Sequence, residues 1–221
     1  MKPISLKKKL FILLPLLVLI ILVGTRVYTV QSKPDDTSHS FDFFTFGKLL
    51  GDNSRNNDTS GANSLYAKGK HIQITEKEYN LHVKVYELKH SKDPKKEALQ
   101  DLLVSKVLYY HAVKEGYSVS DSEINDTIKE LKDSMKTAAN ADDMIAFMKG
   151  FGSEDNYWVY IRDTMKSSAI TNKYLDDLKA EYAKKTHYTG EDTADFQNKW
   201  KNYKADLINS YIKKEKLHYK K

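Results

Sequence analysis

The residues of this chain best suited to metal binding or proton transfer are its seven histidines, and their spacing supports neither role. No two of them have the His-x-x-x-His or His-Glu-x-x-His spacing that places two imidazole rings on one helical face around zinc. The chain has no cysteine, which excludes disulfides, thiolate metal sites and cysteine nucleophiles. We therefore predict no metal site and no cofactor. The histidines are His39, His71, His82, His90, His111, His187 and His218.

Other motifs for catalysis or ion binding are also missing from the sequence. Residues 52–58 alternate oxygen-bearing side chains as a calcium loop does. However, an EF-hand starting at Asp52 needs glycine and glutamate where the chain has Asn57 and Asn63. No Gly-x-Ser-x-Gly, P-loop or Gly-x-Gly-x-x-Gly sequence occurs. We therefore predict that the protein is not an enzyme.

Methionine and aromatic residues are concentrated on both sides of a glycine-rich break at residues 150–152. Such soft, adaptable side chains suit the recognition of many different apolar peptide segments. They equally suit the core of a corner between two helices, and the sequence leaves both alternatives open. Tyr157 and Trp158 are adjacent and cannot both face one core, so we expect at least one to line a groove. The candidate peptide-binding residues are Met144, Phe147, Met148, Phe151, Tyr157, Trp158 and Met165.

The distribution of charge argues against a nucleic-acid partner. The formal net charge is +6, but residues 1–30 hold five basic and no acidic side chains, which leaves +1 for the remaining residues. A protein that binds nucleic acid needs a concentrated basic face. We therefore predict no nucleic-acid binding.

Residues 1–30 have the pattern of an export signal. Lys7, Lys8 and Lys9 precede residues 10–23, which are apolar apart from Pro15. One interpretation is an uncleaved single-pass signal anchor with its N-terminus inside the cell, and the other is a cleaved signal peptide. Both place the remaining chain outside the cytoplasm, because positive residues stay on the cytoplasmic side. We expect a protein of the cell membrane whose bulk is extracytoplasmic, or a secreted one if the signal is cleaved.

Residues 31–64 are predicted to be a flexible extracytoplasmic tether, because they are rich in polar residues and glycine. Four phenylalanines between Phe41 and Phe46 interrupt this polar stretch. Such an apolar patch does not remain in water without a reason. It packs on the folded domain, lies at the membrane surface or acts as an intramolecular pseudo-substrate.

Residues 65–221 are predicted to form an all-α domain. Apart from a short extended segment near Ile72, the apolar residues recur every three or four positions, as on helices. Start signals are Thr75 with Glu78, Asp93 before Pro94, and Ser120 with Glu123. Expected helices follow Thr75, run from Pro94 to about Glu115, follow Ser120, span about Ala141–Lys149, run from Ser153 through Tyr182, and carry Phe196 to Tyr211.

Three motifs, in this order, resemble the SurA/PrsA-type extracytoplasmic foldases over residues 66–182. The motifs are Ile72-x-Ile74-Thr75-x-x-Glu78-Tyr79, the helix–Gly116–turn–helix segment ending in Val119-Ser120-Asp121-x-Glu123, and Gly152-Ser153-Glu154-Asp155-Asn156-Tyr157-Trp158. The resemblance implies a SurA N-terminal-like helical chaperone domain, with a last helix that folds back onto the N-terminal bundle. Many members also carry a parvulin prolyl-isomerase domain. The residues after Tyr182 read as helix and leave no room for one, so we predict no prolyl-isomerase activity.

The sequence therefore favours an ATP-independent, membrane-tethered extracytoplasmic chaperone that holds unfolded exported polypeptides. The alternative is a non-catalytic scaffold that binds one specific partner in the cell envelope or secretion machinery. The identity of the clients and the oligomeric state do not follow from the sequence.

Overall fold

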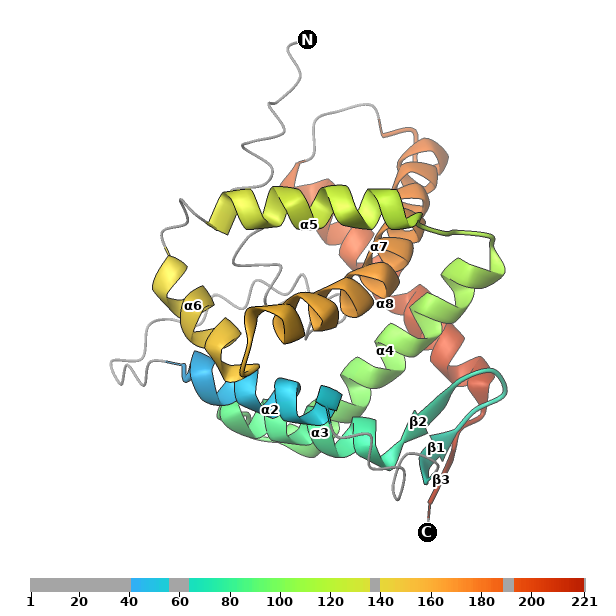
Figure 1. Cartoon of the computed structure of the whole chain (residues 1–221). Coiled ribbons are helices and arrows are strands. Elements are labelled where there is room, and N and C mark those ends of the chain that lie inside the picture. The colour runs from blue at the N-terminus through green and yellow to red at the C-terminus, as the bar shows by residue number, and fades with distance from the viewer. Residues whose placement is uncertain (1–40, 56–63, 136–139, 189–192, 221) are drawn as a thin grey trace.

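Helices make up most of the residues that the computed structural model describes, which are 41–55, 64–135, 140–188 and 193–220 (Figure 1). This confirms the all-α expectation, with one small sheet added. In chain order the elements are α2 (Phe43–Arg55), β1 (Leu65–Lys68), β2 (Gln73–Thr75), α3 (Glu76–Leu88), α4 (Pro94–Lys114), α5 (Asp121–Met135), α6 (Ala141–Gly150), α7 (Glu154–Lys185), α8 (Ala194–Glu215) and β3 (His218–Tyr219).

Two capping boxes start helices where the sequence predicts them. At α3, the Thr75 hydroxyl accepts the Glu78 N–H at 3.1 Å, and the Glu78 carboxylate accepts the Thr75 N–H at 2.9 Å. At α5, Ser120 and Glu123 exchange the same two bonds at 3.2 and 2.8 Å. Each box satisfies N–H groups that have no partner within the helix, so the local sequence determines these starts.

Gly116 ends α4 as predicted. Its φ is +87°, in the left-handed region that glycine adopts without a steric penalty. The Gly116 N–H donates to the Val113 carbonyl and the Tyr117 N–H donates to the Ala112 carbonyl, both at 3.0 Å. These two bonds form a Schellman motif, which turns the chain sharply from α4 towards α5.

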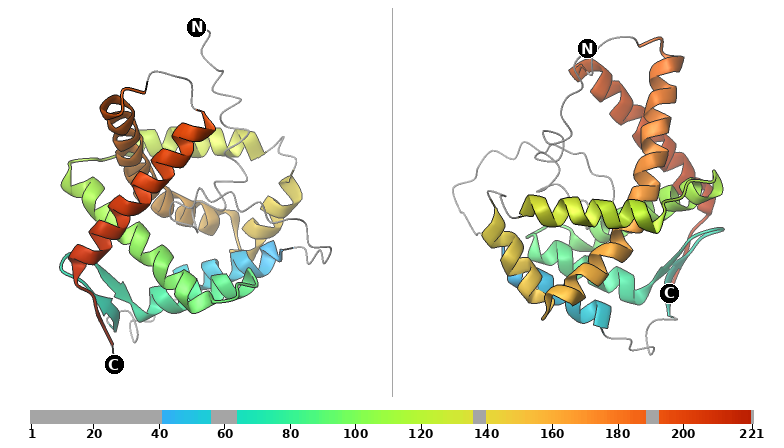
Figure 2. Two further views of the ribbon diagram at one scale, coloured as in Figure 1. Left: turned by 180° about the vertical axis from the view of Figure 1, so that it is seen from behind. Right: turned by 45° about the horizontal axis from the view of Figure 1, so that its top comes forward.

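The helices pack around two main cores that share α7. The first core lies between α2, α3, α5, α6 and the N-terminal half of α7. The second lies between the sheet, α4, the C-terminal half of α7 and α8. Figure 2 shows α8 returning from the far end of α7 to the sheet, across α4. Because α7 contributes to both cores, it fixes the position of the first core relative to the second.

The small sheet has the strand order β2-β1-β3, and both pairings are antiparallel. Ala67 in the central strand lies opposite Ile74 on one side and Tyr219 on the other. The strands β1 and β2 account for the extended segment expected near Ile72. The strand β3 has two residues and was not predicted, because so short a segment carries no alternating pattern.

The predicted tether contains a helix, which corrects the boundary at residue 65. The helix α2 lies inside residues 31–64, and its Phe46 and Leu50 are buried in the first core, with 2% and 1% of their surface exposed. The Phe-rich patch therefore packs on the folded domain, which is the first of the three alternatives. Burial of apolar surface provides the stabilisation that the local sequence of α2 lacks.

The predicted membrane anchor, residues 1–30, lies outside the described residues, as do residues 31–40 and 56–63 of the predicted tether. Among the helices that the structure describes, none has the length and apolar character needed to span a bilayer.

Candidate functional site

Five of the seven candidate peptide-binding residues lie in the protein interior, on α6, on α7 or at the corner between them. Their exposed fractions are at most 6%. The rings of Phe147, Phe151 and Tyr157 pack edge to face with centroids 5.4 to 5.9 Å apart. Burial raises the pKa of the Tyr157 hydroxyl well above its ordinary value. The five are Met144, Phe147, Phe151, Tyr157 and Met165.

The other two candidates, Met148 and Trp158, line a pocket of about 430 Å³ between α5, α6 and α7. Its apolar lining is completed by Met135, Ala141 and Ile145. Tyr157 is in the first core, and the half-buried Trp158 packs against the same core while it also lines the pocket. Neighbouring residues on a helix are separated by about 100°.

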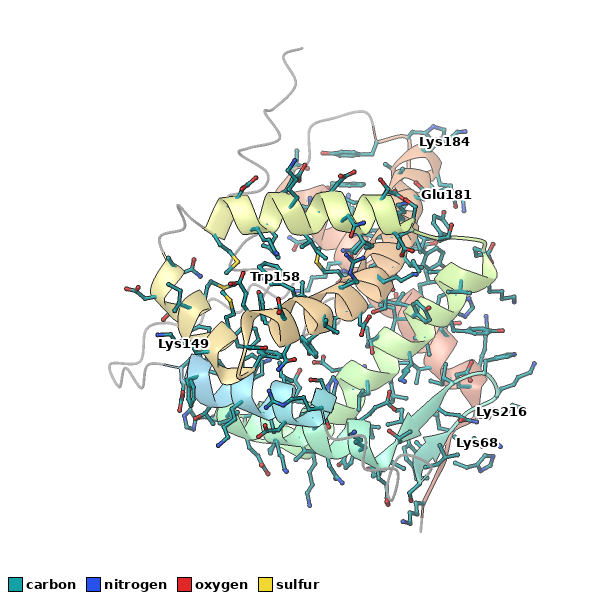
Figure 3. The ribbon with its side chains drawn as sticks, viewed as in Figure 1. Lys68, Lys149, Trp158, Glu181, Lys184 and Lys216 are labelled. Carbon is teal, nitrogen blue, oxygen red and sulfur yellow. The ribbon has the colours of Figure 1, made fainter. Side chains whose placement is uncertain are left out.

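The indole of Trp158 is held in one orientation by neighbours on two helices. Its Nε1–H donates to the Glu154 carboxylate at 2.9 Å, one turn earlier on α7. The Lys132 ammonium on α5 lies 4.6 Å from the centre of the indole ring, a cation–π contact. Figure 3 shows Trp158 in the space between α5 and α7. A ring fixed before binding loses little conformational entropy when a ligand packs against it.

The rim of the pocket carries charges of both signs. Lys129, Lys132 and Asp133 lie on α5, and Glu154 lies on α7. Methionine and isoleucine below such a rim provide a flexible apolar surface that accepts side chains of different shape. The volume falls in the range of about 300–1,000 Å³ found for small binding sites. The arrangement therefore suits non-covalent binding of apolar side chains.

Several pocket residues did not appear among the candidates from the sequence. Ile145 and Met148 are three residues apart on α6, so a helical projection could have grouped them. Met135 and Lys132 come from α5, and only the packing of α5 beside α7 places them near Trp158. No local pattern encodes that juxtaposition.

Two of the histidines, His111 and His71, contact side chains on α8. The His111 ring stacks on Tyr211 with ring centres 3.6 Å apart. The pKa of His111 is lowered, mainly by burial and to a smaller extent by the positive charge of Lys114. The His71 ring contacts the Glu215 carboxylate at 3.1 Å. No three His, Asp or Glu side chains come close enough to hold a metal ion anywhere in the part of the chain that the structure describes.

Comparisons with protein-family models, with curated proteins and with solved structures found no match to this chain. The geometry of the pocket beside Trp158 and the sequence motifs are therefore the observations that bear on function.

Proposed function

We propose that this protein is an ATP-independent chaperone that holds unfolded polypeptides outside the cytoplasm. The Trp158 pocket, which we define as Met135, Ala141, Ile145, Met148 and Trp158 with its charged rim, takes apolar side chains of the client. The predicted anchor at residues 1–30 keeps the protein at the membrane. The mechanism is binding and release, without covalent chemistry.

The observation that carries the proposal is an oriented indole beside flexible aliphatic and thioether side chains on a solvent-accessible surface. Ile145 is 43% exposed. Trp158 packs on the first core and is also held by Glu154 and Lys132. An apolar pocket with a few polar groups on its rim is the usual form of a small binding site. The mixture of one rigid anchor and adaptable neighbours supports binding of varied sequences.

The fold relationship to the SurA/PrsA-type foldases is part of this proposal. It is supported by the three ordered motifs and by the capping geometry found at Thr75, Ser120 and Ser153. It is also supported by the packing of α8 on α4, because the resemblance implies a last helix that returns to the N-terminal bundle. Capping boxes occur in many folds, so the order of the motifs carries more weight than any one of them.

The proposal is tested by the binding of a fluorescently labelled, permanently unfolded polypeptide, followed by anisotropy. We expect saturable binding by the wild type and at least tenfold weaker binding by Trp158→Ala. A matched control is Val159→Ala, because Val159 is 62% exposed and does not line the pocket. Equal binding by the wild type and Trp158→Ala would refute the assignment of the pocket. Crosslinking in cells to one stoichiometric partner, without a range of clients, would identify the scaffold alternative.

A further inference from the structure

The helix α2 covers part of the surface that the sequence assigns to peptide binding. It packs mainly against α6, and also contacts α3 and α7 (Figure 1). The Phe46 ring lies 5.2 Å from the Phe147 ring, and Phe46, Leu50, Phe147 and Phe151 belong to one cluster. An amphipathic helix laid into an apolar groove is a recurring mode of peptide recognition. Here one chain provides both the helix and the groove.

The surface that α2 covers adjoins the Trp158 pocket through the first core. Phe151 and Phe147 both contact Tyr157, whose ring is 4.7 Å from that of Trp158. Met148 packs on the first core and also lines the pocket. A polypeptide seated against Trp158 that extends along α6 therefore meets the surface that α2 occupies.

Glycines fix the register of α2 on α6. A Cβ atom added to Gly47 would lie 2.0 Å from the Phe147 carbonyl oxygen, and one added to Gly150 would lie 2.4 Å from the Lys48 nitrogen. These neighbours are backbone atoms, which cannot move aside as a side chain can. The two helices are therefore in backbone contact, and any larger residue at Gly47 separates them.

The helical state of α2 depends on this docking. It has 13 residues, among them Gly47 and Gly51, and isolated helices of this length are marginal in water even without glycine. Its outer face remains open, since Phe44 is 49% exposed. When it is not docked in the groove, we expect the α2 segment to be unfolded. It then resembles an apolar segment of an unfolded client.

A side-chain hydrogen bond joins the end of α2 to the corner between α6 and α7. Arg55 at its C-terminal end donates to the Phe151 carbonyl and pairs with Asp52 at 2.6 Å. The packing of Phe46 on Phe147 and the close approach of the two backbones at Gly47 and Gly150 are apolar or steric contacts. Such contacts exchange readily for those of another apolar segment, because burial of apolar surface is not directional.

We propose that α2 is an intramolecular ligand that closes a second polypeptide-binding surface, the α6 groove, until a client displaces it. The groove is formed by Phe147, Phe151 and the backbone around Gly150. This inference rests on the proposed chaperone function and adds its regulation: client binding and α2 docking compete. Occupation of the groove by α2 keeps the apolar surface covered when no client is present.

The test uses the full chain in lipid nanodiscs and a labelled peptide of residues 41–55. The Gly47→Ala chain should expel its own α2 and bind the peptide at least tenfold more tightly than the wild-type chain does. The matched control is a 41–55 peptide that itself carries Gly47→Ala, which should not bind, because its Cβ meets the Phe147 carbonyl. Equal binding of the two peptides, or no binding by a folded Gly47→Ala chain, would overturn the proposal.

Arg55→Ala and hydrogen exchange keep the proposal testable if Gly47→Ala prevents folding. Arg55→Ala leaves every groove side chain intact and should raise peptide binding several-fold; no increase would overturn the proposal. In the wild type, a saturating concentration of an unfolded polypeptide should speed amide exchange in α2 at least tenfold. Unchanged amide exchange in α2 while the polypeptide is bound would overturn the proposal.

The outcomes separate this proposal from the proposed function. Equal binding of the unfolded polypeptide by the wild type and Arg55→Ala would overturn the competition and leave the chaperone function standing. A second outcome is that the Gly47→Ala chain binds the 41–55 peptide while neither the wild type nor any variant binds an unfolded polypeptide. That outcome would overturn the chaperone function, and with it the inhibitory role of α2.

Discussion

The rings of Phe46 on α2 and Phe147 on α6 lie with their centres 5.2 Å apart and their planes inclined by 33°. This contact joins a segment from the predicted tether to the corner between α6 and α7. It makes α2 part of the first core, and it places α2 on residues that the sequence assigned to peptide binding. The behaviour of α2 is therefore central to both structure and function.

Phe46→Ala should release α2 selectively. Truncation of a buried phenylalanine costs about 3–5 kcal/mol, and a loss of about 3 kcal/mol corresponds to roughly 100-fold faster exchange of the protected amides. We expect this acceleration in α2, with unchanged exchange in α4, which lies in the second core. Phe44→Ala is the control, since Phe44 is 49% exposed and should change little. Equal effects of the two substitutions would contradict the docking of α2 by Phe46.

Glu215 should stabilise the packing of α8 against the turn between β1 and β2. The carboxylate is 3% exposed and accepts the N–H groups of His71 and Ile72 at 2.7 and 3.2 Å. Glu215→Ala leaves both donors without this acceptor and should lower the free energy of unfolding by about 2–4 kcal/mol. Urea denaturation at pH 7 measures the loss. Glu181→Ala is the control, because Glu181 is exposed (Figure 3), and a change of the same size there would contradict the assignment.

The effect of Glu215→Ala should depend on pH. Burial alone would raise the pKa of Glu215, but the N–H donors of His71 and Ile72 outweigh it, so the pKa is lowered from 4.5. A carboxyl whose folded pKa is lowered stabilises the folded state above its unfolded pKa. That contribution is lost as pH falls through the folded pKa. The difference between wild type and Glu215→Ala should therefore shrink below pH 4.5, and a constant difference would refute this reasoning.

His82 should make the domain less stable in mild acid. In the described residues its Nδ1 is buried with no hydrogen-bond partner, and burial lowers its pKa from 6.5 to about 4. Between these values the unfolded chain binds a proton that the folded state does not. Stability should therefore fall by up to about 3 kcal/mol from pH 6.5 to pH 4.

His82→Leu should reduce this pH dependence. We expect a flatter profile of unfolding free energy between pH 6.5 and pH 4 for the variant than for the wild type, measured by urea denaturation at each pH. Val159→Ala provides the comparison, since it changes an exposed residue that carries no ionisable group and should leave the slope unchanged. A wild-type slope in His82→Leu would show that other groups cause the dependence.

Helix starts and stops could be predicted from the sequence because they depend on local hydrogen bonds. The boxes at Thr75 and Ser120 and the left-handed Gly116 each need only residues within six positions. The helix α2 could not be predicted from the sequence, because two glycines and the polar residues after Leu50 give a weak local helix signal. Its helical state comes from tertiary packing on α6.

The candidate site was predictable only in part for a related reason. The concentration of aromatic and methionine residues around Gly150 marks the corner between α6 and α7, where Trp158 lines the pocket and also packs on the core that contains Tyr157. The wall formed by α5 depends on how α5 packs beside α7. That packing includes long-range contacts such as the bond between Lys173 and Glu123 at 2.7 Å, which no local pattern encodes.

The most direct test of the chaperone function is light scattering by an aggregating, chemically unfolded protein with residues 31–221 added and no nucleotide. We expect suppression at near-stoichiometric ratio by the wild type and by Val159→Ala, and loss of at least half of it in Trp158→Ala. If the wild-type protein is folded and helical by circular dichroism and yet leaves the scattering unchanged, the proposed chaperone function is wrong.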